Sequence, residues 1–329
     1  MPVILLPPDV AVRLRPELGR IPELEVVTPP EEPGAFLAPD VLDRVDAAFF
    51  NLASGPSGTR RILGAARRAT NLRWIHLGHS GVDDPVFEEL IGRGVVVTNS
   101  AGANAEPIAQ SALAGLLALN RGLPGWLDAQ RRHAWEPDPD DLPSEQLPRE
   151  LRGQTMVIFG LGSIGRYVAQ FARAFGIRVI GVRRTPATPE DGVDAWAPPA
   201  RLDEVLPEAD ILVLTAPLTS ETRGTFDARR LDRLPAGAVV INVARGELVD
   251  EAALAERLAS GRLGGAYLDV FVTEPLPAES PLWELPNVLI SPHDSARSAG
   301  TQGRVDAIFL EELGRWLRGE DSPRRARLD

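Results

Sequence analysis

The stretch Thr155-Met156-Val157-Ile158-Phe159-Gly160-Leu161-Gly162-Ser163-Ile164-Gly165 puts an apolar run directly before three closely spaced glycines. The residues that follow, 166–172, have the pattern of an amphipathic helix. A strand, a glycine turn and a helix in this order form the phosphate cradle of dinucleotide-binding sheets. Gly160 permits the tight turn, Gly162 lets the backbone approach a pyrophosphate, and Gly165 lets the helix pack on its strand. The sequence therefore predicts a dinucleotide site.

The surroundings of this turn strengthen the prediction. The first N–H groups of the expected helix, those of Ser163 and Ile164 among them, would be available to bind anionic oxygens. A second apolar strand, 178–182, follows where the ribose-reading residue of such a fold is expected. A lone glycine pattern is weak because turns use glycine for steric reasons alone. In this setting dinucleotide binding is preferred over a merely structural turn.

Short apolar segments alternate with helical ones along the whole chain, which predicts an α/β fold with two doubly wound, Rossmann-like parallel sheets. The expected strands span residues 3–6, 25–28, 46–50, 73–77, 95–98, 155–159, 178–182, 209–215, 238–243, 265–270 and 287–291. The expected helices span residues 84–92, 104–121, 228–234, 250–259 and 301–318.

The length of 329 residues favours two domains over one. We expect a flavodoxin-like, substrate-binding domain of residues 1–103 plus 298–329. Residues 104–297 would form a Rossmann domain that binds the dinucleotide. Two domains imply a cleft between them, and we expect the active site there.

Composition narrows the class of protein. The formal charge of −11 disfavours nucleic acid as a partner, and the absence of Cys excludes disulfides and thiolate metal sites. No basic leader and no apolar run of membrane-spanning length is present, so we expect a soluble, cytoplasmic protein. The basic cluster 324–327 is expected to be a mobile tail, and the Pro- and acid-rich segment 136–143 a turn-forming connection.

Charged residues follow three of the expected strands of the second sheet. Arg245 comes after strand 238–243, Glu274 after 265–270, and His293 after 287–291. Ligands of open α/β sheets bind beyond the carboxyl ends of the strands, so these side chains should converge where a nicotinamide would lie.

The segments around these residues resemble the D-isomer-specific 2-hydroxyacid dehydrogenases, and the resemblance covers nearly the whole chain. It is carried by Asn242-Val243-Ala244-Arg245-Gly246, Asp269-Val270-Phe271-Val272-Thr273-Glu274-Pro275-Leu276-Pro277, Ser291-Pro292-His293, His79-Ser80-Gly81-Val82-Asp83 and Ala216-Pro217-Leu218-Thr219-Ser220-Glu221-Thr222-Arg223. Each motif is modest when taken singly, but together, in the order and spacing of the family, they are specific.

The resemblance implies a role for each site residue. His293 would be the acid/base, and Glu274 would stabilise its protonated imidazole. Arg245 would bind the substrate carboxylate and polarise the carbonyl group. Backbone N–H groups of Ser80 and Gly81 would hold the same carboxylate from the opposite side of the cleft.

The resemblance also implies further contacts and a quaternary state. The remaining cofactor-binding positions carried over from the family are Pro217, Thr222, Val243 and Asp269. Relatives pair through the nucleotide domain, so a homodimer is implied.

The second nucleotide strand ends in Arg183-Arg184, where an NAD-preferring site would carry Asp or Glu for the ribose 2′-hydroxyl. Paired guanidinium groups would suit a 2′-phosphate, so NADP(H) is the preferred cofactor and NAD(H) the possible one. Alternatively, one Arg stacks on the adenine and the enzyme uses both cofactors.

Four residues need separate mention. Asp294 follows the acid/base His where relatives usually carry an apolar residue, and it either points to solvent or acts on that His. Gln110 replaces a Glu that many relatives carry, which would weaken an interdomain hydrogen bond. We expect His76 and His79 to be structural or cleft-lining, because two His without a third ligand make a poor metal site.

The preferred function is NADPH-dependent reduction of a small 2-keto acid to a D-2-hydroxy acid, with a glyoxylate- or hydroxypyruvate-type substrate first. One alternative is an NAD-linked oxidation of D-lactate or 3-phosphoglycerate. Arg183 and Arg184 argue against it, and we expect no regulatory domain of the kind that some phosphoglycerate enzymes append after the last helix. The other alternative is a non-catalytic, nucleotide-sensing corepressor of the same fold.

Overall fold

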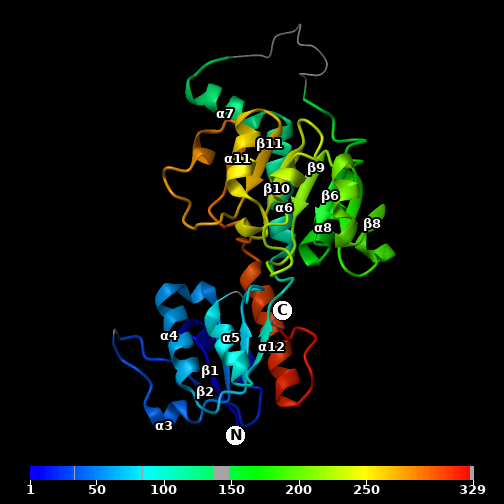
Figure 1. The fold of residues 1–329 in the computed structure, drawn as a ribbon. Helices are drawn as coiled ribbons and strands as arrows, with labels where there is room; N and C mark the ends of the chain where they lie inside the picture. Colours follow the sequence, from blue (N-terminus) through cyan, green and yellow to red (C-terminus); the bar gives the residue numbers. More distant parts are fainter. Residues whose placement is uncertain (33, 83, 136–147, 327–329) are drawn as a thin grey trace. The chain divides into compact units, whose positions relative to one another are not determined.

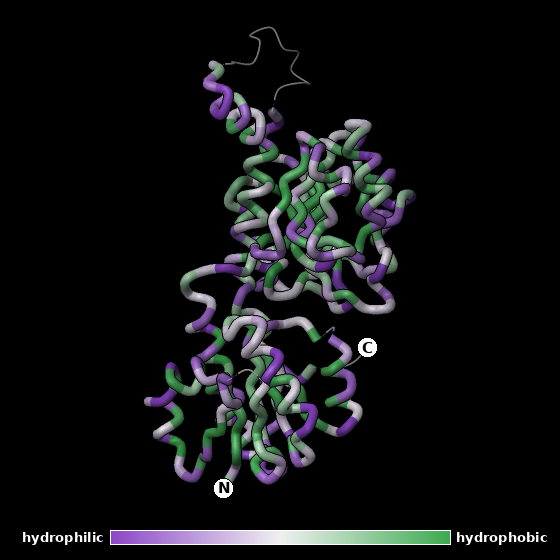
Figure 2. Tube along the Cα trace, turned by 90° about the vertical axis from the view of Figure 1, so that its left-hand side faces the viewer, coloured by the Kyte–Doolittle hydropathy of each residue, from purple (hydrophilic) through white to green (hydrophobic). Residues whose placement is uncertain are grey.

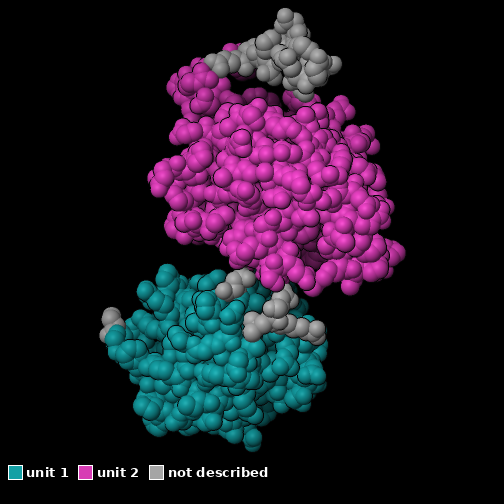
Figure 3. Space-filling model, viewed as in Figure 1, with its two compact units in different colours: residues 1–104, 298–329 teal, residues 105–297 magenta. Residues whose placement is uncertain are grey.

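The computed structural model describes residues 1–32, 34–82, 84–135 and 148–326. The chain forms two compact units, which Figure 3 shows in two colours. Unit 1 consists of Met1–Asn104 and Ser298–Asp329, and unit 2 of Ala105–Arg297. The Pro- and acid-rich segment 136–143, Asp83 and Arg327 lie outside the described residues.

Unit 1 contains a five-stranded parallel sheet in the order β2-β1-β3-β4-β5, covered by helices on both faces (Figure 1). Its strands are β1 Val3–Leu5, β2 Glu25–Val27, β3 Ala47–Phe50, β4 Trp74–Leu77 and β5 Val96–Asn99. Its helices are α1 Pro8–Arg13, α2 Arg15–Leu18, α3 Pro39–Leu42, η1 Leu52–Ser54, α4 Gly55–Arg68, α5 Pro85–Gly92 and α12 Thr301–Leu317.

Two apolar clusters fill the two faces of this sheet. One joins α4 and α5 to the strands through residues such as Ile62 and Phe87. The other joins α1 and α12, and Phe309 of α12 is fully buried in it beside Trp74. The carboxyl-terminal helix is therefore part of the first unit's core although it follows the second unit in sequence.

The described part of the carboxyl-terminal tail is paired with the sheet edge, contrary to the expectation of a mobile tail. Ala326 N donates to Val97 O at 2.8 Å, and Arg324 Nη1 donates to Ala101 O at 2.6 Å. The backbone of β5 would otherwise present unpaired N–H and C=O groups at this edge. Basic composition alone could not reveal this pairing, because it depends on an edge strand more than 200 residues earlier.

Unit 2 contains a seven-stranded parallel sheet in the order β12-β11-β10-β9-β6-β7-β8. Its strands are β6 Thr155–Phe159, β7 Arg178–Val182, β8 Ala195–Ala197, β9 Ile211–Leu214, β10 Val239–Asn242, β11 Gly265–Leu268 and β12 Val288–Ile290. Its α-helices are α6 Ala105–Asn120, α7 Leu123–Arg131, α8 Ser163–Ala174, α9 Leu202–Val205, α10 Ala228–Leu231 and α11 Glu251–Ala259. Its 3₁₀ helices are η3 Pro189–Asp191, η4 Pro199–Arg201, η5 Leu206–Glu208, η6 Gly246–Leu248 and η7 Pro281–Glu284.

The strand order of unit 2 reverses between β6 and β9, which is the point where doubly wound sheets bind nucleotides. Helices α6 and α8 cover one face through small and branched residues such as Ala109 and Val168. Gly115 of α6 is required by this packing, because a Cβ there would lie 2.4 Å from the Tyr267 ring of β11. Apolar residues follow the inner strands in Figure 2.

The predicted fold class, two doubly wound parallel α/β sheets, is confirmed. Most expected strands end within one or two residues of the observed ones. The short strand β8 and helices α4 and α7 were not predicted. Helix α4 begins Gly-Pro-Ser-Gly, a composition typical of a turn, and its identity as a helix depends on burying Ile62, Ala65 and Ala66 against the sheet.

Candidate active site

The glycine turn joins β6 to α8, and a different local environment surrounds each of its three glycines. Gly160 has a φ of +102°, and a Cβ there would lie 2.3 Å from Ala216 N. At Gly165 a Cβ would lie 2.5 Å from Gly160 O. Gly162 differs, because no described atom lies within 4 Å of the Cβ position. The fold needs Gly160 and Gly165, whereas the space beside Gly162 is open to a ligand.

The open end of this turn leads into a pocket of about 410 Å³ at the carboxyl ends of β6, β7 and β9. Its volume falls in the range of small-molecule and cofactor sites. Among the described residues no side chain caps α8, so its first N–H groups are not used by a cap. Of the predicted cofactor residues, the pocket lining includes Gly160, Gly162, Arg183, Arg184, Pro217 and Thr222. The open cradle, the uncapped helix and this lining fit the phosphates of a dinucleotide.

The pocket lining does not include every predicted residue. Ser163 and Ile164 begin α8 beside it, and Val243 is 5% exposed at the end of β10. Thr222 uses its hydroxyl within its own loop, donating to Pro217 O at 2.7 Å. Residues that were not predicted, Thr185, Leu202, Thr219, Glu221 and Arg230 among them, also line the pocket.

Arg183, the residue after β7, bonds to several groups of the protein. Its Nε donates to Thr185 O at 2.9 Å, Nη1 to Leu161 O and Asp191 Oδ1, and Nη2 to Pro186 O and Asp191 Oδ2 at 2.6 and 2.7 Å. A guanidinium has five N–H donors, and all five are thus engaged. In this structure the guanidinium of Arg183 is therefore bonded within the protein, and the predicted contact of Arg183 and Arg184 with a 2′-phosphate stays a prediction.

Arg184 differs from its neighbour. It is exposed and lines the pocket, and it makes no hydrogen bond or ion pair with the described residues. Asp191, which holds Arg183, is 1% exposed and also pairs with Arg166 Nε at 2.7 Å. Burial raises the pKa of Asp191, but the N–H of Thr188 and the charges of Arg183 and Arg166 outweigh it and lower that pKa overall.

His293 and Glu274 form a pair beyond the carboxyl ends of β12 and β11, the last two strands at one edge of the same sheet. His293 Nδ1 lies 2.8 Å from Glu274 Oε2, and the His side chain is 47% exposed. Phe271 N donates to the other carboxylate oxygen, Glu274 Oε1, at 3.0 Å. Because the carboxylate accepts at Nδ1, the opposite nitrogen, Nε2, is the one that can exchange a proton with a substrate. The structure thus brings together two residues that lie 19 positions apart.

The loop that carries His293 is fixed from below by Asp269. His293 has a φ of +53°, in the left-handed region, and its N–H donates to Asp269 O at 2.8 Å. The Asp269 carboxylate accepts from Ser291 Oγ at 2.5 Å and from the backbone of Asp294 and Ser295. It is 1% exposed, and in this structure it holds the loop of His293, while the predicted contact of Asp269 with the cofactor stays a prediction.

Sequence reasoning missed the residues that support these side chains. Ser291 and Ser295 carry no motif beyond their closeness to His293. Asp191 had a weak signal, because the segment from Thr188 to Asp191 has the spacing of a capping box, which the structure forms. That signal identifies a helix start but gives no reason to expect a bond to Arg183.

Arg245 follows β10 and lies directly before η6. Its Nη1 donates to Ala244 O at 2.7 Å, and Asn242 Nδ2 donates to Arg245 O at 2.9 Å. The next residue, Gly246, allows this turn to pack on the neighbouring one, since a Cβ would lie 2.0 Å from Phe271 C. Because β10, β11 and β12 are adjacent, Arg245, Glu274 and His293 all follow neighbouring strands at one edge of the sheet.

In unit 1, the residues predicted to bind substrate follow β4. Ser80 is exposed, its carbonyl accepts from Asn99 Nδ2 at 3.1 Å, and Gly81 is half-buried. His76 is fully buried between Thr98 Oγ1 and Ser100 Oγ, at 2.8 and 2.9 Å. Burial and the charge of Arg324 lower the pKa of His76 to about 3, so this His is neutral.

His79, Asp294 and Gln110 each lie against a nearby side chain of their own unit. The ring of His79 lies edge-on to Phe50, with centroids 5.4 Å apart. Asp294 is half exposed and pairs with Arg297 at 3.4 Å. Gln110 is exposed and donates to Glu106, one turn earlier in α6, at 3.2 Å.

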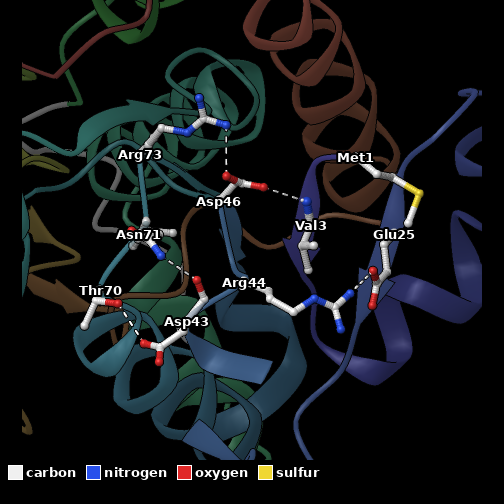
Figure 4. Close-up of a pocket in the computed structure, with 10 residues that line it drawn as sticks. Met1, Val3, Glu25, Asp43, Arg44, Asp46, Thr70, Asn71 and Arg73 are labelled. Carbon is white, nitrogen blue, oxygen red and sulfur yellow. Dashed lines mark hydrogen bonds and ion pairs between the residues drawn. The ribbon is translucent and has the colours of Figure 1, made fainter. Parts of the chain in front are cut away.

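A larger hollow, of about 670 Å³, lies at the amino ends of the strands of unit 1 (Figure 4). Its charged side chains already have partners: Arg44 contacts Glu25, Arg73 contacts Asp46 at 2.9 Å, and Asp43 accepts from Thr70 at 2.8 Å. Asp46 also accepts from Val3 N. Ligands of parallel sheets bind at the carboxyl ends, so this hollow is part of the structural surface.

No helix among them is long and apolar enough to cross a membrane. No group of three or more His, Asp or Glu side chains in the described ranges could hold a metal ion.

Comparisons with known proteins agree with this geometry. The family model described as D-isomer specific 2-hydroxyacid dehydrogenase, NAD binding domain, matches residues 113–295. D-3-phosphoglycerate dehydrogenase of Mycobacterium tuberculosis (strain ATCC 25618 / H37Rv) is 32% identical over 98% of this chain and 58% of its own length. The chain thus spans less than two thirds of that relative.

Two further relatives match over most of both chains. Glyoxylate reductase of Korarchaeum cryptofilum (strain OPF8) is 34% identical over 78% of this chain and 76% of its own. A D-isomer specific 2-hydroxyacid dehydrogenase from Xanthobacter autotrophicus Py2, solved in complex with NADPH and MES, is 30% identical with a TM-score of 0.77, covering 99% of this chain and 98% of its own. The chain belongs to the D-isomer specific 2-hydroxyacid dehydrogenase family.

Proposed function

We propose that the protein reduces a small 2-keto acid of the glyoxylate or hydroxypyruvate type to a D-2-hydroxy acid with NADPH. The observation that carries the proposal is the exposed His293–Glu274 pair, 2.8 Å apart, at the carboxyl edge of a sheet that also bears an open dinucleotide cradle. A proton-transfer group and a nucleotide pocket on one sheet are what carbonyl reduction requires. The glyoxylate reductase among the relatives supports the substrate class.

The residues of this chain handle the proton and the carboxylate. Protonated His293 would donate from Nε2 to the C2 oxygen of the keto acid, while Glu274, fixed by Phe271 N–H, stabilises the imidazolium. The bound nicotinamide would supply the hydride. Arg245 would hold the substrate carboxylate and polarise the carbonyl, because its planar guanidinium offers several donors. The predicted carboxylate contacts of Ser80 and Gly81 stay predictions.

NADPH is proposed over NADH because the position after β7 carries Arg183 in place of an acidic residue, and the exposed Arg184 lines the pocket. The NADPH-bound relative from Xanthobacter autotrophicus supports this choice. One observation weakens it: all five donors of Arg183 are engaged within the protein, which leaves Arg184 as the cation of this loop for a 2′-phosphate.

A second candidate is NAD-linked oxidation of a D-2-hydroxy acid. It is favoured by the engaged donors of Arg183 and by the relatives named D-3-phosphoglycerate dehydrogenase. The same residues would then act in reverse, with His293 accepting the proton from the substrate hydroxyl.

The test is a survey of initial rates, followed by the loss of reduced-nicotinamide absorbance. NADPH and NADH are each combined with glyoxylate, hydroxypyruvate, pyruvate and phenylpyruvate, and the oxidation of D-lactate and 3-phosphoglycerate is measured with NADP⁺ and NAD⁺. Faster turnover of glyoxylate or hydroxypyruvate with NADPH supports the proposal. Faster oxidation with NAD⁺ supports the second candidate, and NADPH binding without turnover of any substrate would favour a nucleotide-sensing protein.

We also propose a homodimer formed through unit 2. Helix α7 stands at one end of this unit, away from the sheet (Figure 1), and Leu123, Trp126 and Leu127 on one of its faces are 36%, 55% and 50% exposed. An apolar helix face of this kind is suited to a second copy of the chain. Light scattering on the wild type and on a Trp126→Glu/Leu127→Glu variant tests it: the wild type should have the mass of a dimer and the variant that of a monomer. The predicted cytoplasmic location stays a prediction, which cell fractionation tests.

A further inference from the structure

Arg183 connects two segments that face the dinucleotide pocket. Through Leu161 O it reaches the glycine turn, and through Thr185 O and Pro186 O it holds the loop after β7. Its side chain is 17% exposed, much less than that of a surface Arg free to follow a ligand. The bonds to three carbonyl oxygens fix the direction in which the backbone leaves β7, just before Arg184.

Asp191 holds Arg183 in this position. Each of its carboxylate oxygens accepts from Arg183, at 3.2 and 2.7 Å, in the bidentate geometry that gives a guanidinium pair its specificity. Oδ1 also pairs with Arg166 of α8, and Oδ2 accepts from Thr188 N at 2.7 Å. A fully buried carboxylate with this many partners ties α8, β7 and η3 together.

We propose that Asp191 keeps Arg183 away from the cofactor: it holds Arg183 as an internal brace of the pocket, so that Arg184 is the guanidinium that contacts a 2′-phosphate. The inference rests on the proposed preference for NADPH and deepens it. For Arg183 to bind a phosphate, it would have to give up the Asp191 pair and leave a buried carboxylate without that partner, which is strongly unfavourable.

Equilibrium dissociation constants for NADPH and NADH, measured by quenching of tryptophan fluorescence, test this without relying on activity. Arg184→Gln should weaken NADPH binding about 10- to 100-fold, because a charge-assisted hydrogen bond is lost, and leave NADH binding within about twofold. Arg173→Gln is the matched control. It makes the same charge change on an exposed residue at the opposite end of α8, so it should leave both constants unchanged.

The second variant combines Arg183→Gln with Asp191→Asn. It removes the Arg183–Asp191 pair, and with it the pair between Asp191 and Arg166, at no change in net charge, so it does not alter the long-range attraction for a phosphate. With the brace lost, NADPH and NADH should weaken alike, and their ratio should stay within about threefold of the wild type. Titrations with adenosine 2′,5′-bisphosphate and AMP, which differ only in the 2′-phosphate, should show the same pattern.

The outcomes separate the two levels of the proposal. A wild type that prefers NADPH, an Arg184 variant that loses most of this preference and a double variant that keeps it support the inference. If the Arg184 variant keeps the preference for NADPH, the inference is overturned, even if the double variant fails to fold. The inference is also overturned if a folded double variant loses NADPH binding but keeps NADH binding. A wild type without preference overturns both the inference and the NADPH assignment, while turnover with NADH would leave the reductase function standing.

Discussion

The two units each place a His near the carboxyl end of a parallel sheet, and they surround it in opposite ways. In unit 1, His76 lies within strand β4, is fully buried, and bonds to the hydroxyls of Thr98 and Ser100 through both ring nitrogens. In unit 2, His293 comes after strand β12, is half exposed, and uses one ring nitrogen for Glu274. Both ring nitrogens of His76 have hydrogen-bond partners in the protein, whereas Nε2 of His293 is left for a ligand.

The difference comes from position along the strand. A side chain within a central strand of a doubly wound sheet is covered by helices on either face, so a His there must satisfy both nitrogens internally. A residue just past the strand lies where ligands bind. Burial lowers the pKa of His76 to about 3 and keeps that ring neutral, whereas the ring of His293 lies beside the Glu274 carboxylate and is half exposed.

The largest expected effect separates the two residues directly. His293→Ala removes the proposed proton donor and should lower kcat for keto acid reduction about 10²- to 10⁴-fold, with cofactor binding retained. His76→Gln, which keeps hydrogen-bonding groups in a buried place, should leave kcat within about twofold at neutral pH while lowering the melting temperature. Steady-state kinetics and thermal unfolding of both variants check this. Near-normal turnover of His293→Ala would remove this residue from the acid/base role.

The second expected effect concerns acid stability. The pKa of His76 in the folded protein is about 3, below its ordinary value of 6.5, so between these values the unfolded chain binds a proton that the folded chain does not. The free energy of unfolding should therefore fall as the pH drops below about 6.5, by at most about 1.4 kcal/mol per unit, until the pH nears 3.

Urea unfolding at about pH 7 and about pH 5 measures this contribution. Carboxylates that lose their charge at low pH also affect the wild type, so the comparison is with His76→Gln. The variant lacks this proton uptake, and its free energy of unfolding should depend less on pH. Equal slopes in the two proteins would contradict a neutral, buried His76.

The third effect tests the partner of His293. Glu274→Gln preserves the shape of the side chain, and its amide oxygen can still accept from Phe271 N–H, but it removes the charge that stabilises the imidazolium. The kcat for reduction should fall about 10- to 100-fold with little change in the dissociation constant of NADPH. Glu279→Gln, the same change on an exposed residue nearby, is the control and should behave as the wild type. Unchanged kcat in Glu274→Gln would leave that carboxylate a structural role only.

The sequence was sufficient for the features that depend on local pattern. Apolar periodicity predicted both sheets, and the order of strand, glycine turn and helix located the nucleotide pocket, because each depends on residues close together in the chain. The closeness of Glu274 and His293 could be predicted because both follow strands, and neighbouring parallel strands end at the same edge. That rule gives their proximity without any knowledge of side-chain contacts.

The features that were missed depend on contacts between distant residues. Arg183 follows β7 as a ribose-reading residue should, yet its five donors are used by the glycine turn, its own loop and Asp191. The carboxylate of Asp269 accepts hydrogen bonds from a loop that lies about 25 residues later in the chain. Whether a charged side chain meets a ligand or the protein is decided by these partners, and no periodicity records them.

The smallest effects should appear among the hydroxyls around the two His residues. Ser100→Ala leaves the buried Nε2 of His76 without a partner and should cost about 1–3 kcal/mol of unfolding free energy, with kcat unchanged. Ser291→Ala removes the hydroxyl that joins Tyr267 to Asp269 under the His293 loop. It should cost about 1 kcal/mol of stability, and it should also lower kcat, by roughly three- to tenfold, because His293 is less firmly held. Chemical denaturation and steady-state kinetics on both variants are the measurement. If Ser100→Ala lowers kcat as much as Ser291→Ala does, the polar groups around His76 are not purely structural, and the division between the two units fails.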